Sequence, residues 1–112
     1  MDVYFTSRSL LKTCMKKKKR AKKFGHQRAR ELKVALDELA AATNLEEIEM
    51  LPHRRLHPLK GAQAGAYSVD IDRQYRIWFR IPDIDEIRDE DGYVDFSEVT
   101  SIEIYFVGDP HD

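Results

Sequence analysis

The chain has 112 residues, of which 42% are hydrophobic and 35% are charged. This length fits one domain, residues 1–112, and is sufficient to bury a core without a structural metal or disulfide. A single cysteine, Cys14, excludes an internal disulfide and suits a reducing compartment. No segment reaches the length of a transmembrane helix, and the first residues form no apolar signal sequence. We therefore expect a cytoplasmic protein with no membrane partner.

The formal net charge of −1 conceals a strong asymmetry along the chain. Residues 1–33 contain twelve Lys and Arg against two Asp and Glu, whereas residues 82–112 contain one against eleven. Such a chain can present a basic face to a polyanion although its overall charge is close to neutral.

The first half of the chain is predicted to be helical after a short strand at residues 3–6. Ser7 is suited to cap a helix over residues 8–23, which contain neither Gly nor Pro. Cys14 lies among apolar residues of this helix and is expected to be a small buried hydrophobe. A second helix is predicted over about residues 26–42, where one face carries an apolar set at spacings of three and four: Ala29, Leu32, Leu36 and Leu39.

The second half alternates between apolar and polar residues. Strands are predicted over residues 66–71, 75–81 and 100–107. An acidic insertion of about residues 83–98 separates the last two strands and is expected to be a protruding hairpin or long loop. The predicted fold class is α+β, with an N-terminal strand and two long helices packed on an antiparallel-rich sheet of about four strands.

Chemistry is suggested by the segment Leu-His-Pro-Leu-Lys-Gly at residues 56–61 and by the hairpin that follows it. If the two strands pair, we expect His57, Lys60, Arg73 and Arg76 to converge on one part of the sheet. Permanent cations stabilise the negative charge of a phosphodiester, and an imidazole moves protons near neutral pH. A further candidate is His111, which follows the last strand, although a histidine at such a position is more often simply solvated.

Three motifs resemble those of HigB-type toxins of the RelE superfamily. Their members here are Leu56-His57-Pro58-Leu59-Lys60-Gly61, Gly65-Ala66-Tyr67-Ser68-Val69 and Tyr75-Arg76-Ile77-Trp78-Phe79. The resemblance implies a RelE-like fold and cleavage of mRNA in the ribosomal decoding site. It also implies inhibition by a cognate antitoxin, often a helix-turn-helix protein, with no metal and no small-molecule cofactor.

The resemblance also assigns residues. His57, Lys60 and Arg76 match family positions that line the RNA site, and His111 joins them as a catalytic residue. The family commonly ends in Asp-Tyr-His, whereas this chain has Asp109-Pro110-His111. Because proline supplies neither a proton nor a backbone donor, we expect cleavage to be slower than in relatives that carry the tyrosine.

RNA contacts are expected from several further residues. Lys16, Lys17, Lys18 and Lys19 belong to a run of seven positive charges in eight residues, which is either a solvated helix face or a surface for a polyanion such as ribosomal RNA. Trp78 shares a strand face with Arg76, so it either stacks on a base or packs against a helix. Arg73 and Asp109 complete the set of expected RNA contacts.

Two other functions remain open at this point. A ParE-like relative would poison DNA gyrase by protein contact, without the phosphate-handling cluster described above. A degenerate toxin would have lost catalysis and would act only as a binding module. Pro110 and the acidic last third of the chain favour this alternative. Fold alone does not separate these functions.

Overall fold

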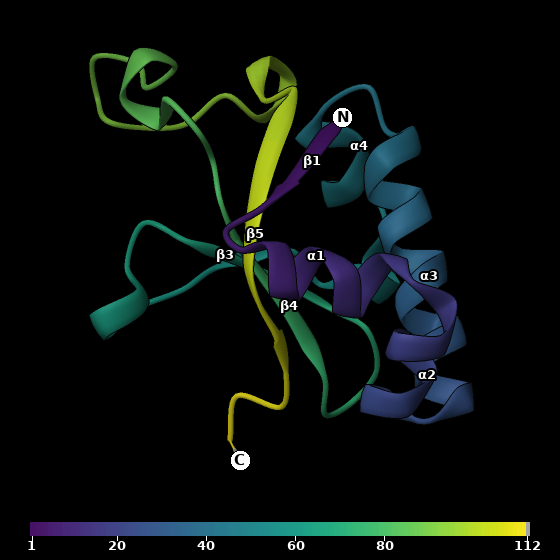
Figure 1. The fold of residues 1–112 in the computed structure, drawn as a ribbon. Coiled ribbons are helices and arrows are strands. Elements are labelled where there is room, and N and C mark those ends of the chain that lie inside the picture. Colours follow the sequence, from purple (N-terminus) through teal and green to yellow (C-terminus); the bar gives the residue numbers. More distant parts are fainter. Residues whose placement is uncertain (112) are drawn as a thin grey trace.

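A five-stranded sheet is covered on one face by helices in the computed structural model, which describes residues 1–111 (Figure 1). The strand order is β1-β5-β4-β3-β2, with β1 parallel to β5 and the other neighbours antiparallel. This arrangement confirms the predicted α+β class. The strands are β1 (Asp2–Phe5), β2 (His57–Pro58), β3 (Tyr67–Asp70), β4 (Arg76–Arg80) and β5 (Ser101–Gly108), and the α-helices are α1 (Arg8–Met15), α2 (Lys17–Phe24), α3 (His26–Ala41) and α4 (Leu45–Glu49).

The first predicted helix is interrupted at Lys16, so residues 8–23 do not form one helix. Lys16 adopts an extended backbone, with φ −92° and ψ 119°, and separates α1 from α2. The buried guanidinium of Arg20 donates from Nη1 to the carbonyl oxygen of Cys14 at 2.8 Å. This side chain satisfies a carbonyl at the end of α1, where the helical pattern of hydrogen bonds stops. The break lets α1 run beside β1 while α2 packs on α3.

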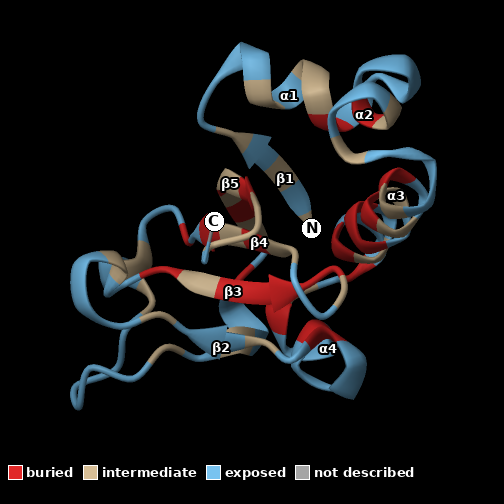
Figure 2. Ribbon diagram, turned by 90° about the horizontal axis from the view of Figure 1, so that it is seen from below, coloured by how far each residue is buried: buried red, intermediate tan, exposed pale blue. Residues whose placement is uncertain are grey.

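The core lies between α3 and the sheet. The predicted apolar face of α3 is confirmed, because its alanine and leucines are at most 5% exposed: Ala29, Leu32, Leu36 and Leu39. The three leucines belong to one cluster with buried residues of the central strands, including Ile77, Phe79 and Ile104. Cys14 also joins this cluster as predicted, and Figure 2 shows buried residues concentrated on α3 and β3.

The sheet has one strand more than predicted. The additional strand, β2, contains only His57 and Pro58, and His57 pairs with Ser68 of β3. A two-residue strand has no alternation that a sequence pattern could reveal. A register shift between β4 and β5 also places Phe106 opposite Trp78 and Ile104 opposite Phe79, which leaves Tyr105 as an extra residue.

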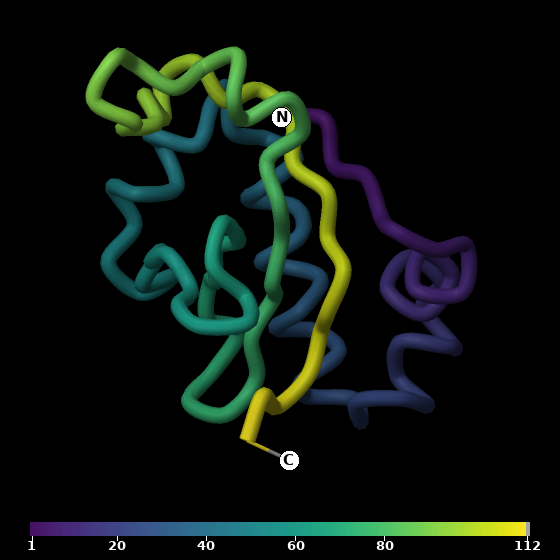
Figure 3. Tube along the Cα trace, turned by 90° about the vertical axis from the view of Figure 1, so that its left-hand side faces the viewer, coloured from purple at the N-terminus to yellow at the C-terminus, as the bar shows by residue number. Residues whose placement is uncertain are grey.

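The acidic insertion lies at the end of the sheet away from α2 (Figures 1 and 3). A single bridge joins Arg88 to Val94, and short 3₁₀-helices at Ile84–Glu86 and Phe96–Glu98 flank it. Four of its apolar side chains pack on the core: Ile84, Ile87, Val94 and Phe96. Phe96 contacts Tyr67 edge-on, with ring centroids 5.5 Å apart. Within residues 1–111, no ion pair joins this acidic segment to the basic first third of the chain.

The helices are short or polar relative to a membrane span. Across residues 1–111, none combines the length and the hydropathy that crossing a bilayer requires.

Candidate functional site

A groove of about 350 Å³ opens on the sheet face that the helices leave uncovered. Cross-strand pairing explains its floor, because His57, Ser68 and Trp78 lie opposite one another on β2, β3 and β4. Residues paired in this way project from the same face of a sheet. The neighbouring Ile77 and Phe79 point to the opposite face and are fully buried in the core. The groove is lined by Arg55, His57, Leu59, Ser68, Arg76, Trp78, Pro110 and His111.

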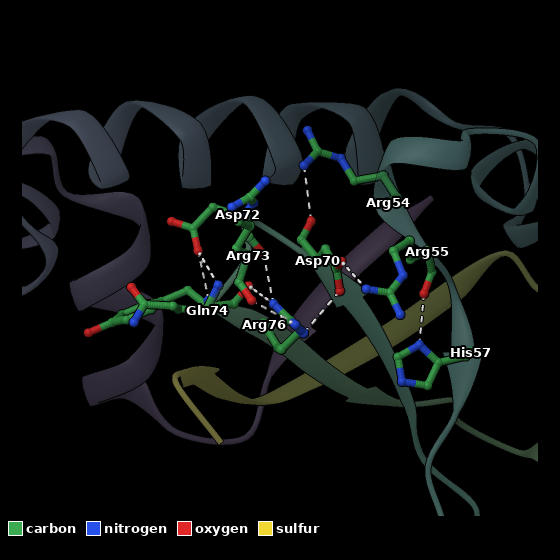
Figure 4. A network of polar contacts seen from close by, with 9 residues as sticks. Arg54, Arg55, His57, Asp70, Asp72, Arg73, Gln74 and Arg76 are labelled. Atoms are coloured by element: carbon green, nitrogen blue, oxygen red, sulfur yellow. Dashed lines mark hydrogen bonds and ion pairs between the residues drawn. The ribbon is translucent and has the colours of Figure 1, made fainter. Parts of the chain in front are cut away.

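The His57 ring is held in one orientation by its own loop. Its Nδ1 lies 2.8 Å from the carbonyl oxygen of Arg55 (Figure 4). A carbonyl oxygen only accepts, so this contact requires the hydrogen of a neutral imidazole to reside on Nδ1. Nε2 then carries the lone pair, and the exposed ring offers it to an incoming ligand. His57 is therefore prepared to accept a proton.

The Arg76 guanidinium is already well occupied. Nη1 donates to the carbonyl oxygens of Asp72 at 2.7 Å and Tyr75 at 3.1 Å, and Nη2 donates to that of Arg73 at 2.9 Å (Figure 4). Nε lies 3.0 Å from Oδ1 of Asp70. A guanidinium has five N–H groups, and these hydrogen bonds use three of them, whereas Nε faces Asp70 as an ion pair without a hydrogen bond. Arg76 therefore fixes the β3–β4 turn and adds positive charge to the groove, with little capacity to bind directly.

Asp70 provides a buried carboxylate beneath two arginines. Its side chain is 9% exposed and lies between Arg76 and Arg55, with Oδ2 3.5 Å from Nη1 of Arg55. Two permanent positive charges against one carboxylate leave a local positive excess, which suits a phosphodiester.

The turn that carries Arg55 and His57 is anchored by Arg54. Nε of Arg54 donates to Oε1 of Glu38 on α3 at 2.6 Å, and Nη1 donates to the carbonyl oxygen of Asp70 at 3.0 Å. The hydrogen bond from Arg54 is the largest cause of a lowered pKa at Glu38, with smaller contributions from His53. The buried guanidinium thus ties the turn to both the helical layer and the sheet.

The segment after β5 returns to the groove. Pro110 and His111 line it, whereas the Asp109 carboxylate accepts a hydrogen bond from the backbone nitrogen of His111 at 2.9 Å. Asp109 thus shapes the turn that presents His111 and is not itself among the lining residues.

The expected convergence of four residues is only partial. The structure brings together His57 and Arg76 but leaves Lys60 and Arg73 outside the groove. Lys60 is exposed where the 3₁₀-helix Gly61–Gln63 begins, because its loop turns away from the sheet. Arg73 lies at the tip of the β3–β4 turn and lines a separate hollow beside the start of α3.

Trp78 packs on other aromatic residues of the uncovered sheet face. Its ring centroid is 4.8 Å from that of Phe106 and 6.1 Å from that of Tyr105. The expectation that it packs against a helix is wrong, because the helices lie on the opposite face of the sheet. The four lysines of the basic run, Lys16–Lys19, are exposed within the helical layer and do not continue the groove.

Two polar residues were not predicted: Ser68, which lines the groove, and Asp70, whose carboxylate contacts Arg55 and Arg76. The Ser68 hydroxyl is buried and has no hydrogen-bond partner among the described residues. Arg55 was not predicted as a site residue either. No strand pattern points to it, because Arg55 follows the 3₁₀-helix Pro52–Arg54 with a left-handed backbone and lies outside β2.

Solved toxins share this fold at low sequence identity. Escherichia coli BL21(DE3) YafQ has a TM-score of 0.53 and 16% identity, over 98% of this chain and 93% of its own. The YoeB/ParE toxin of Agrobacterium tumefaciens has a TM-score of 0.54 and 13% identity, over 97% of this chain and 98% of its own. The matching chain of the Staphylococcus aureus YoeB–YefM complex has a TM-score of 0.55 and 15% identity, over 96% of this chain and 94% of its own. Comparison with curated proteins gives no match.

The fold is therefore that of small RelE-like toxins. The profile of the HigB-like toxins, described as RelE-like toxins of the type II toxin–antitoxin system HigB, matches residues 5–97. The chain belongs to this family. The matched range contains the groove residues of β2, β3 and β4, whereas Pro110 and His111 lie beyond it.

Proposed function

We propose that this toxin cleaves mRNA on the ribosome by metal-independent acid–base chemistry. The observation that carries the proposal is the His57 ring, which lines the groove beside permanent cations and whose Nδ1 is held by the Arg55 carbonyl oxygen, so that Nε2 is left for a ligand. This combination suits a phosphodiester substrate with a neighbouring hydroxyl, as RNA provides.

In the proposed reaction, His57 Nε2 takes the proton of the ribose 2′-hydroxyl. The 2′-oxygen forms a bond to the adjacent phosphorus, and the bond from phosphorus to the 5′-oxygen breaks. His111 donates a proton to that leaving oxygen, so the products are a 2′,3′-cyclic phosphate and a 5′-hydroxyl. Each proton transfer contributes about 10²–10⁴-fold to the rate.

The remaining groove residues support this reaction without transferring protons. The positive charge of Arg76 favours the phosphorane, and the exposed side of Trp78 offers a surface for stacking of a neighbouring base. Lys60 and Arg73 are assigned to RNA contacts outside the groove, together with the exposed Lys16–Lys19, where ribosomal RNA is the expected partner.

A type II toxin has a protein antitoxin, and the Staphylococcus aureus relative was solved in complex with YefM. We propose a cognate antitoxin for this chain as well, of the helix-turn-helix class that HigB-type toxins often have.

The test is expression of the chain without antitoxin, followed by mapping of mRNA 5′ ends. We expect growth arrest with new cleavage sites for the wild type and neither effect for His57→Gln, which retains a polar side chain but lacks the imidazole. Arrest with DNA damage and intact mRNA would instead indicate a gyrase poison. Absence of arrest would indicate a degenerate binding module.

A further inference from the structure

Arg55 is the groove cation whose donors are available to a ligand. Arg76 donates to three carbonyl oxygens and forms an ion pair with Asp70, and the buried Arg54 is bound to Glu38 and the Asp70 carbonyl. The Arg55 side chain is 68% exposed and makes one polar contact within residues 1–111, the 3.5 Å approach to Asp70. A phosphate entering the groove therefore meets free N–H groups at this residue.

The backbone of Arg55 lies in the left-handed region, with φ 45° and ψ 49°. L-residues with a Cβ adopt this region at a cost, whereas glycine adopts it freely. The same conformation turns the Arg55 carbonyl toward Nδ1 of His57 and its guanidinium toward Asp70 (Figure 4). One residue thus sets the tautomer of the imidazole and places a cation beside it.

Asp70 positions this cation without neutralising the groove. Its carboxylate is closer to Arg76, at 3.0 Å, than to Arg55, at 3.5 Å. The longer contact is readily exchanged for a phosphate oxygen, because the exposed Arg55 side chain pays little desolvation on moving. Arginine also binds phosphate with two parallel N–H groups, which fixes the orientation of the bound group.

We infer that Arg55 is the residue that binds the scissile phosphate and that Asp70 is its positioning residue. The Arg55 guanidinium donates to the non-bridging oxygens of the phosphodiester and stabilises the charge that grows on them as the 2′-oxygen attacks. This inference rests on the proposed RNA cleavage and assigns its phosphate-binding group to a residue outside the Leu-His-Pro-Leu-Lys-Gly motif.

Arg55→Gly provides a sharp test, since glycine keeps the carbonyl that orients His57 and tolerates the left-handed backbone. The assay is cleavage of a defined mRNA in a purified translation reaction, with kcat and KM measured separately and thermal unfolding followed in parallel. We expect kcat to fall by about 10²–10³-fold, the effect of losing one donor to a developing oxyanion. The Tm should stay equal or rise, because the backbone strain is relieved.

Two further variants separate the side chain from the backbone. Arg55→Gln should lose cleavage to the same extent, because it also lacks the guanidinium. Asp83→Gly is the matched control, since Asp83 has the same left-handed backbone, with φ 57°, but lies in the insertion away from the groove. It should also keep or raise the Tm while leaving cleavage unchanged.

The possible results separate a failure of the Arg55 assignment from a failure of the proposed function. If the wild type cleaves mRNA and Arg55→Gly or Arg55→Gln cleaves at the wild-type rate, the assignment of Arg55 is overturned while the proposed function stands. If the wild type itself leaves mRNA intact, the proposed function fails and this inference fails with it. Loss of kcat in both Arg55 variants, with an unchanged Asp83→Gly, supports the inference.

Discussion

Replacement of Arg54 by alanine should destabilise the fold and release the turn that carries the groove. The change removes the 2.6 Å hydrogen bond to Glu38 and the 3.0 Å hydrogen bond to the Asp70 carbonyl. Hydrogen bonds that involve a charged group are worth about 1.5–3 kcal/mol each, and loss of one partner of a buried pair costs about 3–5 kcal/mol. Because the Glu38 side chain is 29% exposed, we expect Arg54→Ala to lower the free energy of unfolding by about 3 kcal/mol, the lower part of this range.

Urea unfolding followed by circular dichroism measures this free energy. For a domain of this size, a loss of about 3 kcal/mol corresponds to a fall in Tm of roughly 12 °C. The matched control is Lys33→Ala, which breaks the exposed pair between Lys33 and Asp37 on the same helix and should cost about 0.5 kcal/mol or less. An Arg54→Ala variant no less stable than Lys33→Ala would refute the anchoring role of Arg54.

The pH dependence of the same variant provides a second check. The hydrogen bond from Arg54 holds the pKa of Glu38 below its ordinary value of 4.5. A carboxyl with a lowered pKa stabilises the fold above its unfolded pKa and loses that contribution as the pH falls through its folded pKa. The stability difference between wild type and Arg54→Ala should therefore be largest near neutral pH and narrow below pH 4.5. A stability difference between the two proteins that increases on acidification contradicts the assigned pairing of Arg54 with Glu38.

Three further predictions concern other parts of the molecule. Pro110→Tyr should cleave mRNA faster than the wild type, by up to about 10²-fold if its hydroxyl assists a proton transfer, whereas Pro110→Phe should not. Equal cleavage rates for the wild type, Pro110→Tyr and Pro110→Phe count against the role of Pro110. Substitution of Lys16–Lys19 by glutamine should weaken ribosome binding and reduce the slope of log affinity against log salt by about three, at roughly 0.7 per lost phosphate contact; an unchanged slope excludes the polyanion role. Burial raises the pKa of the Cys14 thiol to about 11, partly offset by Arg20, so thiol-reactive dye should label it at pH 8 only after unfolding. Labelling of the native protein at the rate of the denatured chain contradicts that environment.

Local patterns predicted the elements that have a clear period. The apolar spacing of α3 and the alternation of β3, β4 and β5 depend on neighbours in the sequence, and the structure places all four close to the expected ranges. The break at Lys16 depends on a contact of Arg20 with Cys14 and on the packing of α2 against α3. These are tertiary effects, which override the helix propensity of the intervening lysines.

The groove was predictable only in part for a similar reason. His57 lies on β2 and Arg76 on β4, and the pairing of both strands with β3 brings the two residues to the same sheet face. Lys60 and Arg73 lie in connections, where backbone turns decide the direction of a side chain. The left-handed backbone of Arg55 leaves no mark on the sequence, because an arginine does not signal a positive φ as glycine does.

The parallel pairing of β1 with β5 affects the order in which the sheet and the groove can form. β5 lies between β1 and β4, so the two strands that begin and end the fold must meet before the sheet is complete. Contacts so distant in sequence form late, because a long loop must close before they can form. Since β5 also leads into His111, which lines the groove, the groove is complete only when β5 has joined the sheet between β1 and β4.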